Sequence, residues 1–153
     1  MPLILFVFFL ICHGIAQAET CQWWFQRYGW EKFSVTEVEN CLKIGSPVTA
    51  DIVGGESSLH IAAEVNNDPE VLLRLIRAGG EINGTTKKGW TPLHSAARFN
   101  PNPEILLTLI DAGAAMNAQT ESGKTFIFWM EKNSRLKKTV GYLKLLNMYS
   151  QNN

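Results

Sequence analysis

The sequence predicts an all-α solenoid, in which short helix-turn-helix units stack in a row and are joined by hairpin-like loops. A nine-residue motif that occurs over residues 55–63 recurs, 34 residues later, over residues 89–97. The stretches that follow the two copies, 68–79 and 102–113, also match each other, and their apolar residues recur at helical spacing. Weaker copies flank this pair on both sides. A recurring motif, a recurring helical pattern and degenerate ends together indicate a stacked array of small units.

The 34-residue offset divides the chain into four units of one repeat domain that spans residues 19–153. Upstream, the weaker copy at 41–45 aligns with 75–79, and downstream Gly123 aligns with Gly89. The approximate bounds of the units are 21–54, 55–88, 89–122 and 123–153. The two central units match well. The two end units are degenerate, as expected of caps that cover the open ends of a stack.

The first 18 residues have the outline of a secretory signal peptide. They contain no charged side chain, they are apolar from Leu3 to Cys12, and they end on small residues at Ala16 and Ala18. The apolar run is shorter than the roughly 18 residues that a membrane-spanning helix needs. We expect cleavage after Ala18 and a secreted or periplasmic protein. Because the usual positive flank is missing, an uncleaved membrane anchor is the alternative.

Export would leave two cysteines, Cys21 and Cys41, in a compartment where thiols oxidise. We expect a disulfide between them, with two buried free thiols as the alternative. The bridge would close a loop of about 20 residues, for which the chain-entropy model gives on the order of 3 kcal/mol.

Both end units are rich in aromatic residues. Those of the first unit are Trp23, Trp24, Phe25, Tyr28, Trp30 and Phe33. They either plug the open end of the stack or form an exposed patch for a partner. In the last unit, residues 126–129 place bulky aromatics where the central units have small groups, and residues 136–149 predict a closing amphipathic helix. We interpret the last unit as a terminal cap.

Each central unit contains the start and stop signals of two short helices. Thr91 is placed to N-cap the first helix, and Pro92 occupies its first turn, where a missing N–H costs nothing. Leu93 and the small alanine pair at 96–97 lie on one helical face, so that a neighbouring helix can pack closely. The second helix ends at Gly113, a residue suited to a left-handed C-cap. The polar stretches between the units predict projecting loops.

The motif over 89–97, Gly-Trp-Thr-Pro-Leu-His-Ser-Ala-Ala, resembles the ankyrin repeat almost letter for letter. The resemblance covers nearly all of the chain from Cys21 to Tyr149, and it implies an ankyrin-repeat solenoid. It also implies structural roles for the repeated positions, in which the histidine ties its loop to the helix by hydrogen bonds. Those positions are Gly55, Leu59, His60, Gly89, Thr91, Pro92, Leu93 and His94.

No feature of the sequence predicts a catalytic residue, a metal site or a cofactor. His60 and His94 occupy equivalent positions one unit apart, too far for a shared ion whose Zn–N bonds are about 2.0–2.1 Å. The Gly-Lys-Thr at 123–125 lacks both the earlier glycine and the preceding strand of a phosphate-binding loop. No serine or cysteine is paired with a histidine in a recognisable signature. We therefore expect a protein that is not an enzyme.

The formal net charge is zero, with 14 basic and 14 acidic residues, which argues against nucleic acid as a partner. The charge is nevertheless uneven, because six basic residues after Ala118 face only Glu121 and Glu131. The six are Lys124, Lys132, Arg135, Lys137, Lys138 and Lys144. They form either a solvated helix face or a basic end that steers an acidic partner or a membrane surface.

The resemblance implies a non-catalytic, monomeric module that binds an unidentified protein through its concave face and loop tips, without nucleic acid or a small-molecule substrate. The candidate contact residues are Thr86, Lys87, Lys88, Trp90, Ser95, Arg98, Phe99, Ile61 and Glu64. Trp90 is the strongest candidate, because an exposed tryptophan flanked by lysines is typical of an interface anchor, unless it only packs across its own loop. The alternatives are an accessory that protects or stabilises an envelope enzyme, and a secreted effector that acts on a host protein.

Overall fold

The computed structural model of the 153-residue chain describes residues 21, 24, 26, 29–49, 51–52 and 54–151. The predicted signal segment over 1–18 lies outside these residues, as do Trp23, Phe25 and Tyr28. Every regular element in the described part of the chain is a helix, which confirms the predicted all-α fold. Among these described helices, none has both the length and the apolar character that crossing a membrane requires.

Seven α-helices and two short 3-10 helices make up the described fold. The α-helices are α2 (Val35–Lys43), α3 (Ser58–Val65), α4 (Pro69–Arg77), α5 (Pro92–Phe99), α6 (Pro103–Asp111), α7 (Phe126–Lys132) and α8 (Val140–Gln151). The 3-10 helices are η2 (Trp30–Lys32) and η3 (Leu136–Lys138). The starts of α3 and α5, and those of α4 and α6, both differ by 34 residues, so the predicted offset is confirmed.

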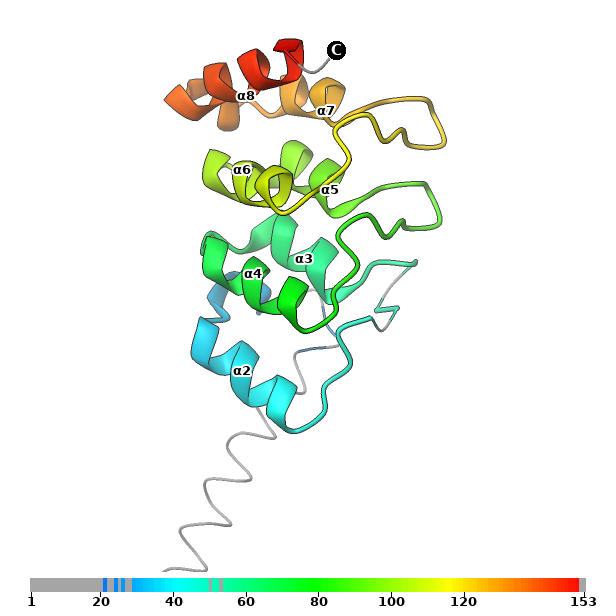
Figure 1. Ribbon diagram of the computed structural model, residues 1–153, viewed down its shortest axis with the longest axis vertical. Coiled ribbons are helices and arrows are strands. Elements are labelled where there is room, and N and C mark those ends of the chain that lie inside the picture. The colour runs from blue at the N-terminus through cyan, green and yellow to red at the C-terminus, as the bar shows by residue number, and fades with distance from the viewer. Residues whose placement is uncertain are drawn as a thin grey trace, which may run out of the picture.

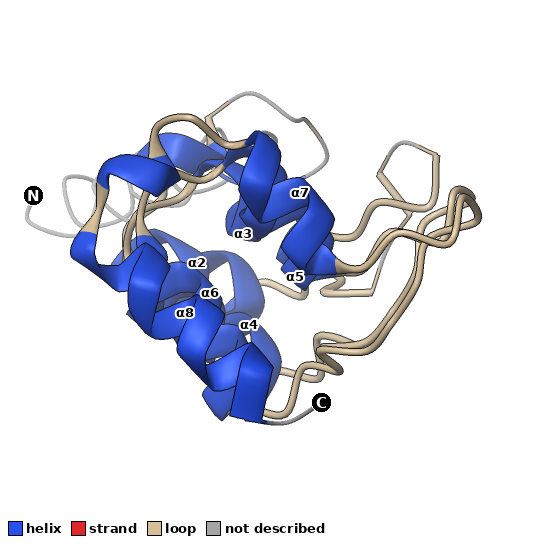
Figure 2. Cartoon of the chain, turned by 90° about the horizontal axis from the view of Figure 1, so that it is seen from above, coloured by secondary structure: helices blue, strands red, loops and turns tan. Residues whose placement is uncertain are grey.

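The helices form two layers that run along the stack (Figure 1). The first helices of successive units, α3, α5 and α7, form one layer, and α2, α4, α6 and α8 form the other. Figure 2, which looks along the stack, shows the connecting loops projecting to one side as a row of fingers. The fingers lie next to the layer of first helices, so the face between fingers and first helices is the concave face of the solenoid.

The ends of the helices follow the local signals of the sequence. Thr91 occupies the N-cap position of α5 with an extended backbone, and its hydroxyl lies 2.8 Å from Nδ1 of His94. Pro92 begins the helix. Gly113 follows α6 with φ +101°, a left-handed conformation that a glycine adopts without strain. Leu93 is buried, and the alanine pair at 96–97 has no exposed surface, which allows α3, α5 and α7 to pack closely.

Three buried asparagines form a ladder of hydrogen bonds between adjacent units. Asn66, Asn100 and Asn133 each directly follow the first helix of their unit, and all three are at most 4% exposed. The Nδ2 amide of Asn100 donates to the carbonyl oxygens of Ala63 and Asn66 at 3.1 and 2.8 Å. Asn66 and Asn133 make equivalent pairs of bonds to the preceding unit. The ladder therefore supplies partners for carbonyls that the end of each helix leaves unsatisfied.

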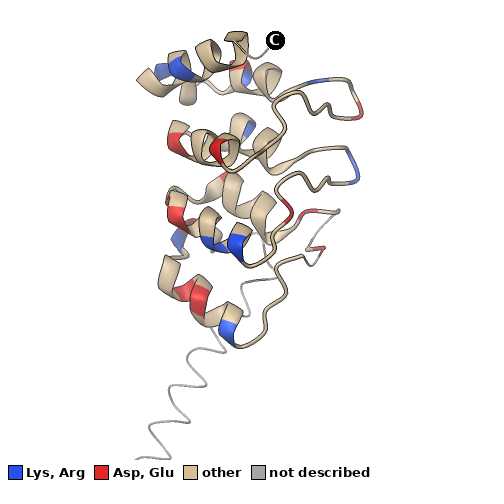
Figure 3. Cartoon of the chain, viewed as in Figure 1, with Lys and Arg blue, Asp and Glu red and all other residues tan. Residues whose placement is uncertain are grey.

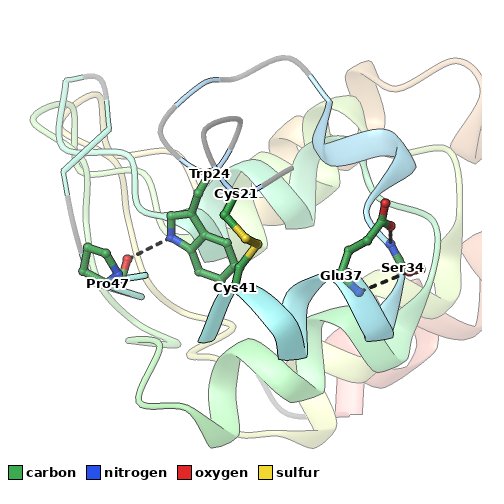
Figure 4. Close-up of a disulfide and its surroundings, with 6 residues drawn as sticks. All are labelled: Cys21, Trp24, Ser34, Glu37, Cys41 and Pro47. Atoms are coloured by element: carbon green, nitrogen blue, oxygen red, sulfur yellow. Dashed lines mark hydrogen bonds between the residues drawn. A yellow bond between two sulfur atoms is a disulfide. The ribbon is translucent and has the colours of Figure 1, made fainter. Parts of the chain in front are cut away.

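A disulfide fastens the start of the described chain to α2. It joins Cys21 to Cys41, whose Cα atoms lie 5.4 Å apart, and thereby confirms the predicted pairing (Figure 4). The adjacent Trp24 donates its indole N–H to the carbonyl oxygen of Pro47 at 2.9 Å. Trp24 and Trp30 have no exposed surface, and their ring centroids lie 5.0 Å apart. These two tryptophans plug the end of the stack and do not form an exposed patch.

The last unit departs from the predicted single helix over residues 136–149. A break at Thr139 separates η3 from α8, because its backbone is extended and its hydroxyl donates to the carbonyl oxygen of Leu136 at 2.7 Å. Val140 and Leu143 are 89% and 68% exposed, whereas Leu145 is fully buried. The prediction of one continuous amphipathic helix is therefore wrong at its start.

Candidate functional site

The predicted contact residues separate into an accessible group and a buried group. The accessible group consists of Lys87, Lys88 and Phe99, which are exposed, and of Thr86, Trp90 and Arg98, which are half-buried. They lie on the loop tip over 86–90 and at the C-terminal end of α5. Together they form one edge of the concave face. Their role in binding stays a prediction.

Ile61, Ser95 and Glu64 form the buried group. Their exposed fractions are 1%, 2% and 9%, so the expectation that they lie on the accessible side of the first helices is wrong. The reason is the close packing of α3 on α5 and of α5 on α7, the helices that carry Ile61 and Ser95. The surface that a partner can reach is correspondingly smaller than the sequence predicted.

The loop tip over residues 86–90 is a closed and hydrogen-bonded turn. The Thr86 N–H donates to the carbonyl oxygen of Trp90 at 2.9 Å, and the Thr86 hydroxyl accepts from the N–H groups of Lys88 and Trp90 at 3.3 and 3.2 Å. Gly89 has φ +72°, and a Cβ atom there would come within 2.9 Å of the Glu121 nitrogen. The Glu121 N–H donates to the carbonyl oxygen of Lys88 at 3.1 Å. Neighbouring tips therefore support one another as a preformed surface.

Two buried histidines fasten the fingers to the first helices. Nδ1 of His94 accepts from the Thr91 N–H at 3.2 Å. In both histidines Nε2 lies close to a carbonyl oxygen of the next finger: that of Trp90 for His60, at 3.0 Å, and that of Lys124 for His94, at 3.1 Å. Desolvation by burial lowers the pKa of both imidazoles below the ordinary 6.5, which favours the neutral form. The carbonyl oxygen beside each Nε2 assigns the proton of the neutral ring to that nitrogen. The described residues contain no group of three or more metal-ligating side chains. The predicted structural role of the histidines is confirmed.

Four aromatic side chains from three segments form a continuous cluster on this face. The ring centroid of Trp90 lies 6.1 Å from that of Phe99 and 4.6 Å from that of Trp129. Phe128 packs edge-on against Trp129 at 5.0 Å. Phe99 is 39% exposed, and the other three are half-buried. We call Trp90, Phe99, Phe128 and Trp129 the aromatic cluster. Trp90 therefore packs against the neighbouring helices and not only across its own loop.

Five basic side chains accompany the aromatic cluster, and we call them the basic rim. They are Lys87, Lys88, Arg98, Lys124 and Lys132. The Arg98 guanidinium lies 5.4 Å from the ring centroid of Phe99, and the ammonium groups of Lys124 and Lys132 lie 4.8 and 5.4 Å from that of Phe128. Figure 3 shows a basic tip on one of the two fingers farthest from the N-terminal end, and on the last finger a basic stretch beside an acidic tip.

The ion pairs of the described residues lie elsewhere. They join Arg74 to Glu39 and Glu70, and Arg77 to Glu70, on α2 and α4. Among the described residues, no cation of the basic rim is within ion-pair distance of a carboxylate. The basic rim therefore presents positive charge that the described surface does not neutralise by direct pairing.

A groove of about 450 Å³ lies between the loop tips and the end of α5. It is lined by Gly54, Glu56, Thr86, Lys87, Lys88, Trp90 and Phe99. Two of the lining residues belong to the aromatic cluster and two to the basic rim. The groove thus offers apolar contact beside positive charge, the combination that a protein interface uses for an anchor residue and its polar surroundings.

Four residues of this surface were not predicted to belong to it, because their segment was interpreted as a cap: Phe128, Trp129, Lys124 and Lys132. The 34-residue offset was a usable signal, since it places Trp129 at the position of Ser95, and Lys132 at that of Arg98. In α7 the position equivalent to Ser95 is occupied by Trp129, whose ring contacts that of Trp90. The last unit therefore caps the stack and also contributes to the concave face.

A comparison with protein families matches residues 55–148 to the model of ankyrin repeats in three copies. The match includes both central units and most of the last one. A search of curated proteins found no match.

Proposed function

The chain belongs to the ankyrin-repeat family, and we propose that it is an exported, non-catalytic module that binds a partner protein through its concave face and loop tips. Ankyrin repeats are generally protein–protein interaction modules. The family supports protein binding as a class of function. The export, the face and the partner are our proposal.

The observation that carries the proposed binding face is the aromatic cluster beside the groove. Phe99 is 39% exposed and Trp90 is half-buried, although the stack has an extensive buried core in which such side chains are accommodated. Large aromatic residues and arginine in a partly buried, rigid setting are enriched among the residues that dominate binding energy. The hydrogen-bonded tip holds Trp90 in place before any partner arrives, which reduces the entropy lost on binding.

Two observations support export. The first 18 residues have the composition of a signal peptide. The disulfide between Cys21 and Cys41 is of a kind that persists in oxidising compartments and is rare in the cytosol. N-terminal sequencing of the protein recovered from its native cells tests this part of the proposal: a chain that begins at Glu19 supports export, and an intact Met1 in the cytosol contradicts it.

Affinity purification from the native compartment tests the proposed binding face. The double variant Trp90→Ala/Lys88→Glu should lose the proteins that the wild-type chain captures, while its circular dichroism spectrum stays that of a folded chain. Its melting temperature should fall, because Trp90 packs on Phe99 and Trp129, so capture is compared well below both melting temperatures. The matched control is Lys43→Glu, which reverses an exposed lysine on α2, outside the concave face. Equal capture by the double variant and the wild type would contradict the proposed face.

A further inference from the structure

We propose that the aromatic cluster and the basic rim bind an acidic segment of the partner protein, which places an aliphatic or aromatic side chain in the groove lined by Trp90 and Phe99. This inference rests on the proposed binding function and specifies the chemistry of the partner. It combines three observations: unpaired positive charge, an exposed apolar anchor point and a preformed groove.

The charge around the cluster is one-sided. Three carboxylates belong to the same face: Glu56 lines the groove, Glu121 lies on the neighbouring loop tip, and the buried Glu64 precedes Arg98 by one repeat of 34 residues. Glu131 is an exposed residue of α7, and its charge contributes, after desolvation by burial, to the raised pKa of Tyr142 on α8. Five cations of this surface therefore stand against two accessible carboxylates, Glu56 and Glu121, and the buried Glu64. A partner that supplies several carboxylates would complete ion pairs that the described chain does not form by itself.

The groove specifies an apolar group next to those carboxylates. Phe99 and Trp90 line it together with Lys87 and Lys88. An apolar side chain placed there would remove exposed aromatic surface from water, at roughly 25 cal/mol per Å² of buried apolar area. Acidic side chains on either side of the anchor would then reach the lysines. An acidic peptide with a single apolar anchor matches both parts of the surface.

The ring geometry favours a peptide over a single-stranded nucleic acid, which also seeks aromatic and basic surfaces. Nucleobases bind by stacking on free ring faces. Here Trp90 and Trp129 contact each other at 4.6 Å, Lys124 and Lys132 lie over Phe128, and Arg98 lies over Phe99. Much of the stacking surface is therefore already occupied by protein groups. Carboxylates of a peptide need only cations to pair with, and the four lysines of the basic rim are exposed.

The test is selection of a displayed library of random peptides, about 12 residues long, on the full chain without a preset composition. We expect the enriched pool to combine Asp and Glu with Leu, Phe or Trp. The best peptide is then synthesised with a fluorescent label, and its Kd is measured by anisotropy at low and high salt. The double reversal Lys88→Glu/Lys124→Glu should weaken binding by on the order of tenfold, because two exposed pairs are lost and become repulsive. The matched reversal Lys43→Glu/Lys144→Glu, at exposed lysines of α2 and α8, should leave Kd within about twofold.

The possible outcomes separate the two proposals. An enriched pool that is neutral or basic, but whose binding is lost with Trp90→Ala/Lys88→Glu, would overturn the acidic partner and leave the binding face standing. A Kd that changes by less than about twofold with either double reversal would also overturn the acidic partner. Tighter binding to a single-stranded thymidine oligonucleotide than to the best acidic peptide would replace the peptide by nucleic acid. If no peptide is enriched, and if every variant on this face captures the same native proteins as the wild type, the proposed function itself is wrong.

Discussion

Replacing Asn100 by alanine should destabilise the protein by about 2–4 kcal/mol, because the side chain makes three hydrogen bonds at a position with no exposed surface. Its Nδ2 group donates to the carbonyl oxygens of Ala63 and Asn66 at 3.1 and 2.8 Å, and its Oδ1 accepts from the Asn102 N–H at 2.8 Å. Each bond contributes about 0.5–1.5 kcal/mol net, and a buried polar group that is left unsatisfied costs about 1–3 kcal/mol. The loss is a large fraction of the roughly 5–15 kcal/mol by which a domain is stable.

Urea unfolding followed by circular dichroism measures this change as a lower midpoint. The matched control is Asn147→Ala, at an exposed position of α8, which should stay within about 0.5 kcal/mol of the wild type. The isosteric Asn100→Asp is a sharper probe, because a carboxylate keeps the acceptor for Asn102 but faces two carbonyl oxygens without a proton to donate. At neutral pH it should destabilise at least as much as alanine. If both Asn100 variants have the same urea midpoint as the Asn147 control, the ladder does not hold the units together.

Three further predictions concern the disulfide, the histidines and the loop-tip glycines. Reduction of the disulfide, which spans 20 residues of sequence, should lower the free energy of unfolding by about 3 kcal/mol, measured as a lower urea midpoint with reductant than without. Because burial lowers the pKa of His60 and His94, the unfolded chain binds more protons than the folded one; the stability is therefore complete above pH 6.5 and falls as the pH is lowered through that value. Urea midpoints between neutral and acid pH should show this fall, and His60→Gln/His94→Gln should reduce it; an unchanged slope would exclude the histidines as its source. Gly89→Ala should destabilise the protein more than Gly123→Ala. Both glycines have a left-handed φ, but only at Gly89 would the new Cβ atom approach backbone, at 2.9 Å from the Glu121 nitrogen. Equal urea midpoints of the two variants would contradict the close contact between loop tips.

The proposed binding surface was predictable only in part. Residues of the loop tip, from Thr86 to Trp90, were identified from the repeat pattern, because loops that connect stacked units project into solvent. Ile61 and Ser95 were assigned to the same face and are buried, because α3, α5 and α7 pack too closely to leave that position open. The sequence pattern locates a residue on a helix, whereas its exposure depends on the distance to the next helix.

Sequence signals were sufficient for the fold class and for the start of α5 and the end of α6. The structural role of the histidines followed from the family resemblance, and the cysteine pairing from the two cysteines that export would leave. Caps, first-turn prolines and left-handed glycines act within one or two helical turns, so they can be read without knowing the rest of the chain. Only the tertiary structure brought Trp90 and Trp129 to 4.6 Å and placed the basic side chains of two units around them. That contact depends on how far α7 stands from α5, and this distance follows from the packing of all units together.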